Sequence, residues 1–274
     1  MSSAVKGSLQ FIGNATTLIR YNGFTLLTDP NFLHRGQRAY LGHGLFSRRL
    51  TDPALEIEDL PTLDVVVLSH MHGDHWDRVT RRGLDHDTPI VTTLSAAGKL
   101  RRRGFGQSVG LRQWQQHELR NAQGSVTITA LPAKHAPGPL ERLLPPVIGT
   151  MLEFRDREDR VELRLHISGD TLLDRRLDAI PRRFPEIDVA LVHLGGTKLL
   201  GSVLVTMDGS QGASWVDLLD PRTVVPIHYD DYTVFTSPLD DFRHHVEEAG
   251  LGGRVVYLER GETRELAPHQ IARR

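Results

Sequence analysis

The sequence contains no cysteine, few aromatic residues and no long apolar run. The absence of cysteine excludes disulfide bonds, thiolate catalysis and sulfur-ligated metals, so histidine and carboxylate side chains remain as the strong metal ligands. No stretch of about 18 consecutive apolar residues occurs, and residues 1–20 hold no run of signal-peptide length. We therefore expect neither export nor stable membrane insertion, and a cytoplasmic protein is the default expectation.

The chain also lacks an excess of charge of either sign. Its 33 Lys and Arg residues face 34 Asp and Glu residues, which gives a formal net charge of −1. A domain without a global positive field is not drawn to nucleic acid or to anionic lipid. We therefore expect a small-molecule substrate, neutral or anionic, and no nucleic-acid partner, while homo-oligomerisation stays open.

Hydrophobic residues make up 39% of the 274 residues, which is enough for a buried core and excludes fibrous and disordered classes. Short apolar runs alternate with helical patterns along the chain. Strands are expected at 8–12, 16–21, 24–28, 63–69, 89–92, 125–131, 147–154, 161–167, 189–193, 224–227 and 254–258, with Asn22-Gly23 as a hairpin turn. Helices are expected at 95–103, with Ser95 as N-cap, at 211–219 and at 239–249.

No repeat, low-complexity tract or linker interrupts these elements, so we predict one domain over residues 1–274. The elements predict the α/β (α+β) class, with two mixed sheets packed face to face and helices outside. Between Pro30 and Pro61 no regular period appears, and a stretch that long in a compact domain is usually functional or mobile. We interpret residues 31–60 as a covering loop without assigning its role.

Histidine is the abundant exception, with 14 residues, and four metal-competent side chains fall together in one short segment. His70, His72, Asp74 and His75 form the pattern H-x-H-x-D-H directly after the apolar run 65–68, a predicted buried strand. Positions 70 and 72 point the same way in an extended chain, and a turn after them would bring positions 74 and 75 to a second point nearby. The pattern favours two metal ions over one.

Three further candidate ligands follow predicted strands elsewhere in the chain. Strand ends that meet at one edge of a sheet bring such side chains together. The predicted ligand set is His70, His72 and His135 for one ion, Asp74, His75 and His228 for the other, and Asp170 as the bridge between them.

This set of imidazoles and carboxylates favours zinc, with manganese or iron as alternatives. Two cations a few ångströms apart lower the pKa of a shared water and stabilise the oxyanion that forms when the resulting hydroxide attacks a carbonyl or phosphoryl centre. We assign Asp74 and Asp170 to catalysis as well as to metal binding. His193, at the end of a predicted strand, is a candidate proton donor or substrate contact, although a histidine in such a place is more often structural.

The arrangement resembles the metallo-β-lactamase superfamily. The resemblance is carried by the histidine cluster, the single His135, Gly169-Asp170-Thr171, Pro226-Ile227-His228-Tyr229, Gly13-Asn14-Ala15-Thr16 and Thr28-Asp29-Pro30. Together these motifs look like the branch that contains L-ascorbate-6-phosphate lactonases and N-acyl-phosphatidylethanolamine phospholipase D. The resemblance implies an αββα four-layer sandwich with the metals at one edge of the sheets. It also implies that Asp29 lies behind a ligand histidine and fixes its tautomer.

Two segments near this predicted site have open interpretations. The loop 31–60 carries a group of basic and aromatic residues, namely His34, Arg35, Arg38, Tyr40, His43, Arg48 and Arg49. Guanidinium groups match phosphate or carboxylate, but a solvated surface is the favoured interpretation. The Pro-rich segment 136–146 is consistent with a wall or lid of the pocket. The remaining histidines are interpreted as surface or packing residues: His86, His117, His166, His244, His245 and His269.

The predicted function is a binuclear metal-dependent hydrolase of the lactonase or phosphodiesterase type. A metal-bridging hydroxide would cleave a small ester, lactone or phosphodiester. A nuclease of the same fold is a rival, disfavoured by the neutral charge of the chain. A non-catalytic metal- and ligand-binding sensor or scaffold is a second rival, disfavoured because all seven expected ligand positions are filled.

Overall fold

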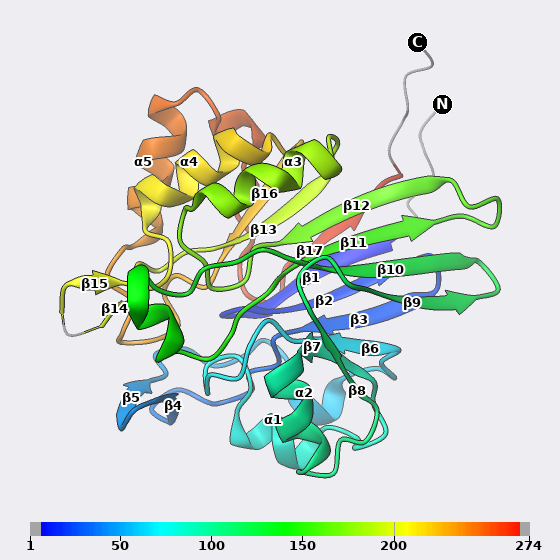
Figure 1. The fold of residues 1–274 in the computed structure, drawn as a ribbon, viewed down its shortest axis with the longest axis horizontal. Coiled ribbons are helices and arrows are strands. Elements are labelled where there is room, and N and C mark those ends of the chain that lie inside the picture. Colours follow the sequence, from blue (N-terminus) through cyan, green and yellow to red (C-terminus); the bar gives the residue numbers. More distant parts are fainter. Residues whose placement is uncertain (1–6, 200, 269–274) are drawn as a thin grey trace.

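Two large mixed sheets face each other in the computed structural model, which describes residues 7–199 and 201–268 (Figure 1). The seven-stranded sheet has the spatial order β17 (Thr263–Leu266), β1 (Gly7–Gly13), β2 (Thr16–Tyr21), β3 (Phe24–Thr28), β6 (Val65–Val67), β7 (Ile90–Thr93) and β8 (Ser108–Leu111). The six-stranded sheet has the order β16 (Thr223–Ile227), β13 (Val189–His193), β12 (Val161–Ile167), β11 (Gly149–Arg155), β10 (Gly124–Leu131) and β9 (Gln116–Asn121).

Helices lie on the outer faces of both sheets (Figure 1). The seven-stranded sheet is covered by α1 (Arg78–Gly83) and α2 (Leu94–Arg101), and the six-stranded sheet by α3 (Ala179–Arg183), α4 (Gly209–Leu219) and α5 (Leu239–Glu248). Short 3₁₀ helices are η1 (Ile57–Asp59), η2 (Gly138–Arg142), η3 (Arg175–Asp178) and η4 (Gly252–Arg254). Two small hairpins are β4 (Arg38–Gly42) with β5 (Leu45–Arg48), and β14 (Lys198–Leu199) with β15 (Val203–Leu204). The predicted four-layer αββα arrangement is confirmed.

The alternation of side chains along one strand explains how the layers hold together. In β13, Val189 and Leu191 pack into the core between the two sheets, whereas Ala190 and Val192 pack under the outer helices. The apolar run Val189–Val192 is therefore buried on both faces of the sheet, as a continuous apolar run predicts.

Parallel pairing sets the position of the functional site. Strand β6 pairs with β3 in parallel, and β13 pairs in parallel with both β12 and β16. Parallel strands bring their carboxyl ends to the same edge of a sheet. Most candidate ligands lie in the segments that follow these strands, whereas His135 follows β10, which pairs antiparallel with β9 and β11.

Several predicted elements need correction. Strands β2, β3, β12 and β13 match their predicted ranges residue for residue. The N-cap of α2 is Thr93 and not Ser95, because the Thr93 hydroxyl accepts a hydrogen bond from the amide of Ala96. The predicted strand 254–258 is wrong: η4 overlaps its start, and Val255 makes only an isolated bridge to Val224.

The segment 31–60 is more regular than its sequence predicts. It contains the β4–β5 hairpin and η1, and the backbone amide of Gly73 donates to the carbonyl of Tyr40 at 2.9 Å. The hairpin is thus tied to the histidine segment by a backbone hydrogen bond. In the described parts of the chain, no helix has both the length and the apolar character needed to cross a membrane.

Candidate metal centre

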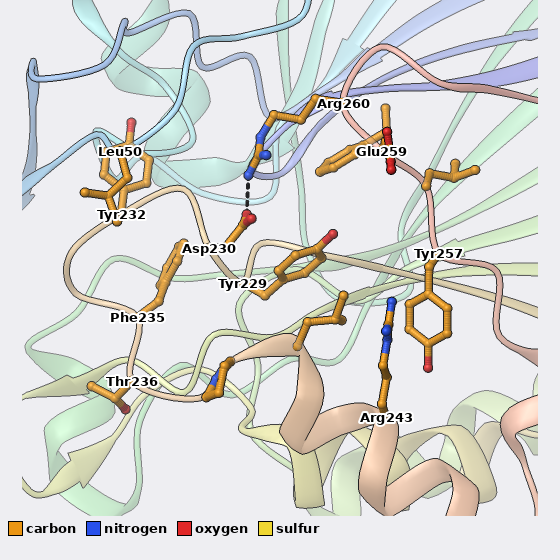
Figure 2. Close-up of a pocket in the computed structure, with 14 residues that line it drawn as sticks. Leu50, Tyr229, Asp230, Tyr232, Phe235, Thr236, Arg243, Tyr257, Glu259 and Arg260 are labelled. Carbon is orange, nitrogen blue, oxygen red and sulfur yellow. Dashed lines mark hydrogen bonds and ion pairs between the residues drawn. The ribbon is translucent and has the colours of Figure 1, made fainter.

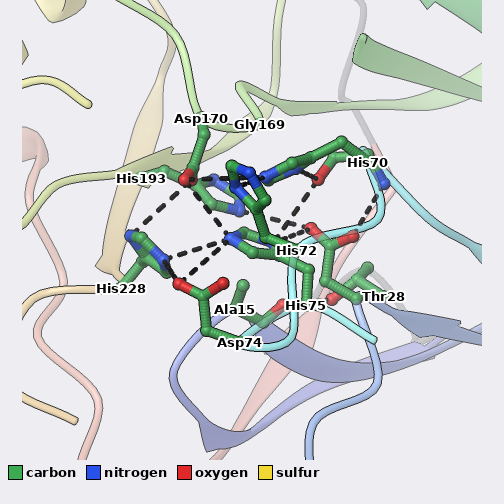
Figure 3. Close-up of polar contacts among 12 residues, drawn as sticks. Ala15, Thr28, His70, His72, Asp74, His75, Gly169, Asp170, His193 and His228 are labelled. Atoms are coloured by element: carbon green, nitrogen blue, oxygen red, sulfur yellow. Dashed lines mark hydrogen bonds and ion pairs between the residues drawn. The ribbon is translucent and has the colours of Figure 1, made fainter. Parts of the chain in front are cut away.

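The histidine segment after β6 meets three other segments at one edge of the sheets. Figure 3 shows His70, His72 and His75 beside Asp170, which follows β12, and His228, which follows β16. All of these side chains are buried. Residues separated by up to 158 positions in the sequence, from 70 to 228, therefore line one small volume.

The first group of ligand atoms comes from three imidazoles. His70 Nε2 lies 3.0 Å from His72 Nδ1, and His135 Nε2 lies 3.2 Å from the same atom. Two nitrogens bound tetrahedrally to zinc at about 2.0–2.1 Å are roughly 3.3 Å apart. The spacing of these nitrogens therefore fits a shared ion.

The second group joins one carboxylate to two imidazoles. His75 Nε2 lies 3.2 Å from His228 Nε2, and Asp74 Oδ2 lies 3.5 Å from His228 Nε2 and 3.9 Å from His75 Nε2. Because each residue brings one ligand atom within 4.8 Å of the others, this trio too has the geometry of a candidate metal site.

The Asp170 carboxylate lies between the two groups. Its Oδ2 is 4.0 Å from His70 Nε2 and 3.4 Å from His75 Nε2, and its Oδ1 is 3.6 Å from His228 Nδ1. Oδ1 of Asp170 and Oδ1 of Asp74 are both buried without a hydrogen-bond partner in the described structure. Buried anionic oxygens without donors require a compensating cation, so the residues present fit divalent metal ions.

Hydrogen bonds to the opposite ring nitrogen orient the ligand histidines. His135 Nδ1 lies 3.0 Å from the carbonyl of Val205, and His228 Nδ1 lies 3.1 Å from the carbonyl of Leu194. A carbonyl only accepts, so each Nδ1 carries the proton and each Nε2 is left with its lone pair facing the centre. His70 Nδ1 has the Ser69 hydroxyl as its partner at 3.0 Å. These supporting groups could not be identified from the sequence, because backbone carbonyls leave no signature in a sequence.

Asp29 lies directly behind His75. Its Oδ2 is 3.2 Å from His75 Nδ1 and 3.4 Å from His193 Nε2, while its Oδ1 accepts the Ser69 amide at 2.7 Å. Burial opposes ionisation of Asp29, but the charges of His75 and hydrogen bonding with His193 outweigh it and lower the pKa to about 2. An ionised acceptor at this position holds the proton of His75 on Nδ1 and frees Nε2.

Burial governs the protonation of the first group. It lowers the pKa of His72 to about 3, with His135 adding to the effect, and it also lowers the pKa of His70 and of His135. The three imidazoles are therefore neutral near pH 7, which is the state that binds metal.

His193 is fully buried. Its ring stacks on that of His75 with centroids 5.9 Å apart, and its Nδ1 lies 3.1 Å from the Ser168 hydroxyl. His193 therefore packs against a candidate ligand, His75.

The segment that carries His228 is anchored by a buried ion pair. Asp231 Oδ1 lies 3.1 Å from Arg49 Nη2, and both side chains are 0% exposed. Asp231 Oδ2 accepts the amide of Asn14, whose carbonyl in turn accepts the amide of His228. The Asn14 side chain also donates to the carbonyl of Asp74. One carboxylate thus supports the backbone of two candidate ligands.

The basic group of the loop 31–60 divides in the structure. Arg49 is no anion clamp, because it is buried and paired with Asp231. His43 contacts the carbonyl of Leu143 through Nε2 at 2.6 Å, and His34 pairs with Glu56. Arg38 and Tyr40 remain exposed.

Among the other histidines, His166 is a packing residue, buried and stacked on Trp215 with ring centroids 5.1 Å apart. His244 and His245 lie on the surface of α5 beside Glu248. His269 lies outside the described residues.

A cavity of about 780 Å³ opens beside His135. The Pro-rich segment forms much of its wall, with apolar contributions from Pro139, Leu144 and Pro145. Arg176, also in the wall, forms a two-point ion pair with Glu141. The cavity therefore places mostly apolar surface next to one candidate ligand.

Comparison with known proteins gives a consistent assignment. Residues 25–229 match the model of the beta-lactamase superfamily domain. A UPF0173 metal-dependent hydrolase of Deinococcus radiodurans is 32% identical over 204 residues, which cover 73% of this chain and 79% of the relative.

Solved structures show the same fold. An isothiocyanate hydrolase from Delia radicum gut bacteria superposes with a TM-score of 0.80 at 23% identity, covering 95% of this chain and 99% of the other. A possible metal-dependent hydrolase of Veillonella parvula also has a TM-score of 0.80, at 21% identity, with 96% and 100% covered. Taken with the match over residues 25–229, the αββα layers and the histidine and aspartate groups at the sheet edge, these findings show that the chain belongs to the beta-lactamase superfamily.

Proposed function

We propose that this protein is a metal-dependent hydrolase with a two-ion centre, acting on a small ester, lactone or phosphodiester. The main support is the Asp170 carboxylate, whose Oδ2 lies 4.0 Å from Nε2 of His70, in the first group, and 3.4 Å from Nε2 of His75, in the second. A carboxylate that contacts both histidine groups suits a bridge between two ions. The metal-dependent hydrolase named among the relatives supports the same activity.

The ligands proposed for one ion are His70, His72 and His135, and for the other Asp74, His75 and His228. Divalent ions held there would supply Lewis-acid chemistry, namely activation of a water molecule and stabilisation of negative charge on the substrate. The thiolate-free donor set favours zinc, and manganese or iron are alternatives.

The remaining polar residues are proposed to orient these ligands. Asp29 fixes the tautomer of His75, and His193 supports Asp29 through the contact at 3.4 Å. His193 is therefore proposed as a positioning residue, in place of the proton donor considered from the sequence. The cavity beside His135 is proposed to receive the apolar part of the substrate.

Metal removal is the first test. Exhaustive chelation is expected to abolish turnover, and addition of Zn²⁺ or Mn²⁺ is expected to restore it, because activation of the attacking water is assigned to the metal ions and the chain has no cysteine nucleophile. The assay should use a panel of lactones, thioesters, bis(p-nitrophenyl) phosphate and an isothiocyanate, with Asp74→Ala as the inactive control. Turnover that survives chelation would contradict the proposal. Stoichiometric metal without turnover of any panel member would favour the sensor or scaffold.

Asp29→Asn tests the proposed orientation of His75. The carboxylate of Asp29 has two accepting oxygens, one for the Ser69 amide and one for the Nδ1 proton of His75, whereas asparagine has only one. We therefore expect metal affinity to fall by about 10–100-fold. Asp29 has a φ of +32°, a conformation that asparagine tolerates better than alanine. Metal titration of both Asp29→Asn and Asp29→Ala, with circular dichroism as the folding control, checks the expectation. Unchanged metal content in both variants would contradict it.

A further inference from the structure

A groove of about 420 Å³ lies behind the metal-binding segment, between the β4–β5 hairpin and the helices α1 and α2. These three elements lie together at one end of the molecule (Figure 1). Met71 and Gly73, which alternate with the candidate ligands His70, His72 and Asp74, line the groove, but none of those ligands does. The groove is thus separated from the proposed metal ions by the backbone of the segment that holds them.

Five cationic side chains surround this groove, although the whole chain is close to neutral. They are Arg38 from β4, Arg78 and Arg81 from α1, Lys99 from α2, and Arg103 from the segment just after α2. All five are exposed, and among the described residues no carboxylate forms an ion pair with any of them. Like charges three positions apart on a helix, such as Arg78 and Arg81, repel one another. The positive potential of the groove is therefore unbalanced by the protein itself.

Asp77 is the single acidic residue in the wall of the groove, and its charge is already engaged. Its Oδ2 accepts the amides of Phe32 and Leu33 at 2.6 and 2.8 Å, and its Oδ1 accepts the amide of Thr80 at 2.8 Å as the N-cap of α1. The carboxylate is directed to backbone donors and is not paired with a neighbouring cation.

Aromatic side chains complete the groove. Tyr40 is 51% and Phe46 62% exposed, and their ring centroids are 5.1 Å apart at the rim. Exposed aromatic rings of this size do not gain the free energy that burial of their apolar surface would provide. A planar ring of a ligand would stack on them and bury the exposed area.

A larger cavity of about 900 Å³ next to Tyr229 offers a contrast (Figure 2). It is also lined by aromatic residues, but its two arginines are paired with carboxylates, Arg243 with Asp240 and Arg260 with Asp230 and Asp231. Figure 2 shows the ion pair between Arg260 and Asp230. Only the groove behind the metal-binding segment combines aromatic rings with uncompensated positive charge among the cavities described here.

We propose that this groove binds a nucleoside phosphate. The phosphate oxygens contact the guanidinium groups of Arg78 and Arg81 and the Lys99 ammonium, because arginine forks and lysine match phosphate oxygens. The planar base stacks on Phe46 and Tyr40. This ligand site is additional to the metal centre, and Gly73 links the two through its hydrogen bond to Tyr40.

Calorimetry on the metal-loaded protein tests the site with two probes, ADP and pyrophosphate. We expect both to bind, and ADP to bind more tightly because its base adds stacking. The double variant Arg81→Gln/Lys99→Gln should weaken ADP binding at least about tenfold. The matched control Arg82→Gln, an exposed arginine of α1 that does not line the groove, should leave it unchanged. Phe46→Ala should remove the advantage of ADP over pyrophosphate.

The Asp170→Asn variant separates the groove from the metal centre. ADP binding that survives in Asp170→Asn and falls in Arg81→Gln/Lys99→Gln supports the proposal. The reverse pattern would show that phosphate sits on the metal ions and would overturn it. The assignment of a nucleoside phosphate would be overturned if ADP and pyrophosphate bind equally tightly. It would also be overturned if the protein binds only anionic phosphatidylglycerol vesicles or an RNA oligonucleotide.

Discussion

Asp170→Ala is expected to lower turnover at least about a thousandfold, because charge stabilisation by a metal pair contributes several kcal/mol to the transition state. The buried Asp170 carboxylate contacts three histidines, His70, His75 and His228, and it faces both proposed ion sites. Although burial opposes it, His228 and His75 hold the pKa of Asp170 well below its usual value, so the group is an anion at neutral pH. If Asp170 bridges two ions as proposed, its removal deprives both ion sites of a ligand.

Steady-state kinetics and elemental analysis on the same preparations check this expectation. Asp178→Ala, which removes an exposed carboxylate eight residues further on, is the matched control and should retain full activity and metal. A loss of less than about tenfold in Asp170→Ala, with full metal content, would contradict the bridging role.

Asp231→Asn is expected to lower the free energy of unfolding by about 3–5 kcal/mol. The variant leaves Arg49 buried at 0% exposure without its counter-charge, and an unpaired buried charge is costly. Asp231 also accepts the amide of Asn14, which supports the backbone of His228, so metal affinity should fall together with stability.

Urea denaturation of the metal-free protein measures this effect without metal linkage. Asp230→Asn is the control, because Asp230 is about half exposed and an exposed ion pair contributes at most about 1 kcal/mol. The double variant Arg49→Met/Asp231→Leu should be more stable than Asp231→Asn, since it removes both charges. If Asp231→Asn lowers the free energy of unfolding by less than about 1 kcal/mol, the proposed anchoring role is contradicted.

The contribution of Asp231 to the free energy of unfolding depends on pH in a defined direction. Burial would raise the pKa of Asp231, but Arg49 and Arg260 outweigh it and hold the pKa below its usual value. A carboxyl with a lowered pKa in the folded state stabilises the fold above its unfolded pKa of about 4, and this stabilisation is lost as the pH falls through the lowered value. The difference in stability between wild type and Asp231→Asn should therefore shrink in acid.

The sequence predicted the parts of the fold that depend on local patterns. Strands such as β12 and β13 have continuous apolar runs between turn residues, so their ends were located residue for residue. The predicted start of α2 was wrong because Thr93 and Ser95 are both competent N-caps, and in the structure the Thr93 side chain caps the helix at the end of β7. The run 254–258 has strand-like composition, but in the structure only Val255 bridges to a neighbouring strand.

The site was predictable to the extent that its ligands cluster or recur at strand ends. His70 to His75 form a local pattern, whereas the proximity of His135 and His228 depends on sheet topology that spacing alone does not supply. The role of Arg49 was misjudged for the same reason, since its partner Asp231 lies 182 positions further along the chain. The supporting carbonyls of Val205 and Leu194 belong to apolar residues and carry no chemical signal in the sequence.

Anomalous diffraction from crystals of the metal-loaded protein locates the bound ions themselves. We expect two anomalous peaks, one among His70, His72 and His135 and one among Asp74, His75 and His228, with the Asp170 carboxylate between them. A single peak, or peaks bound by other side chains, would contradict it.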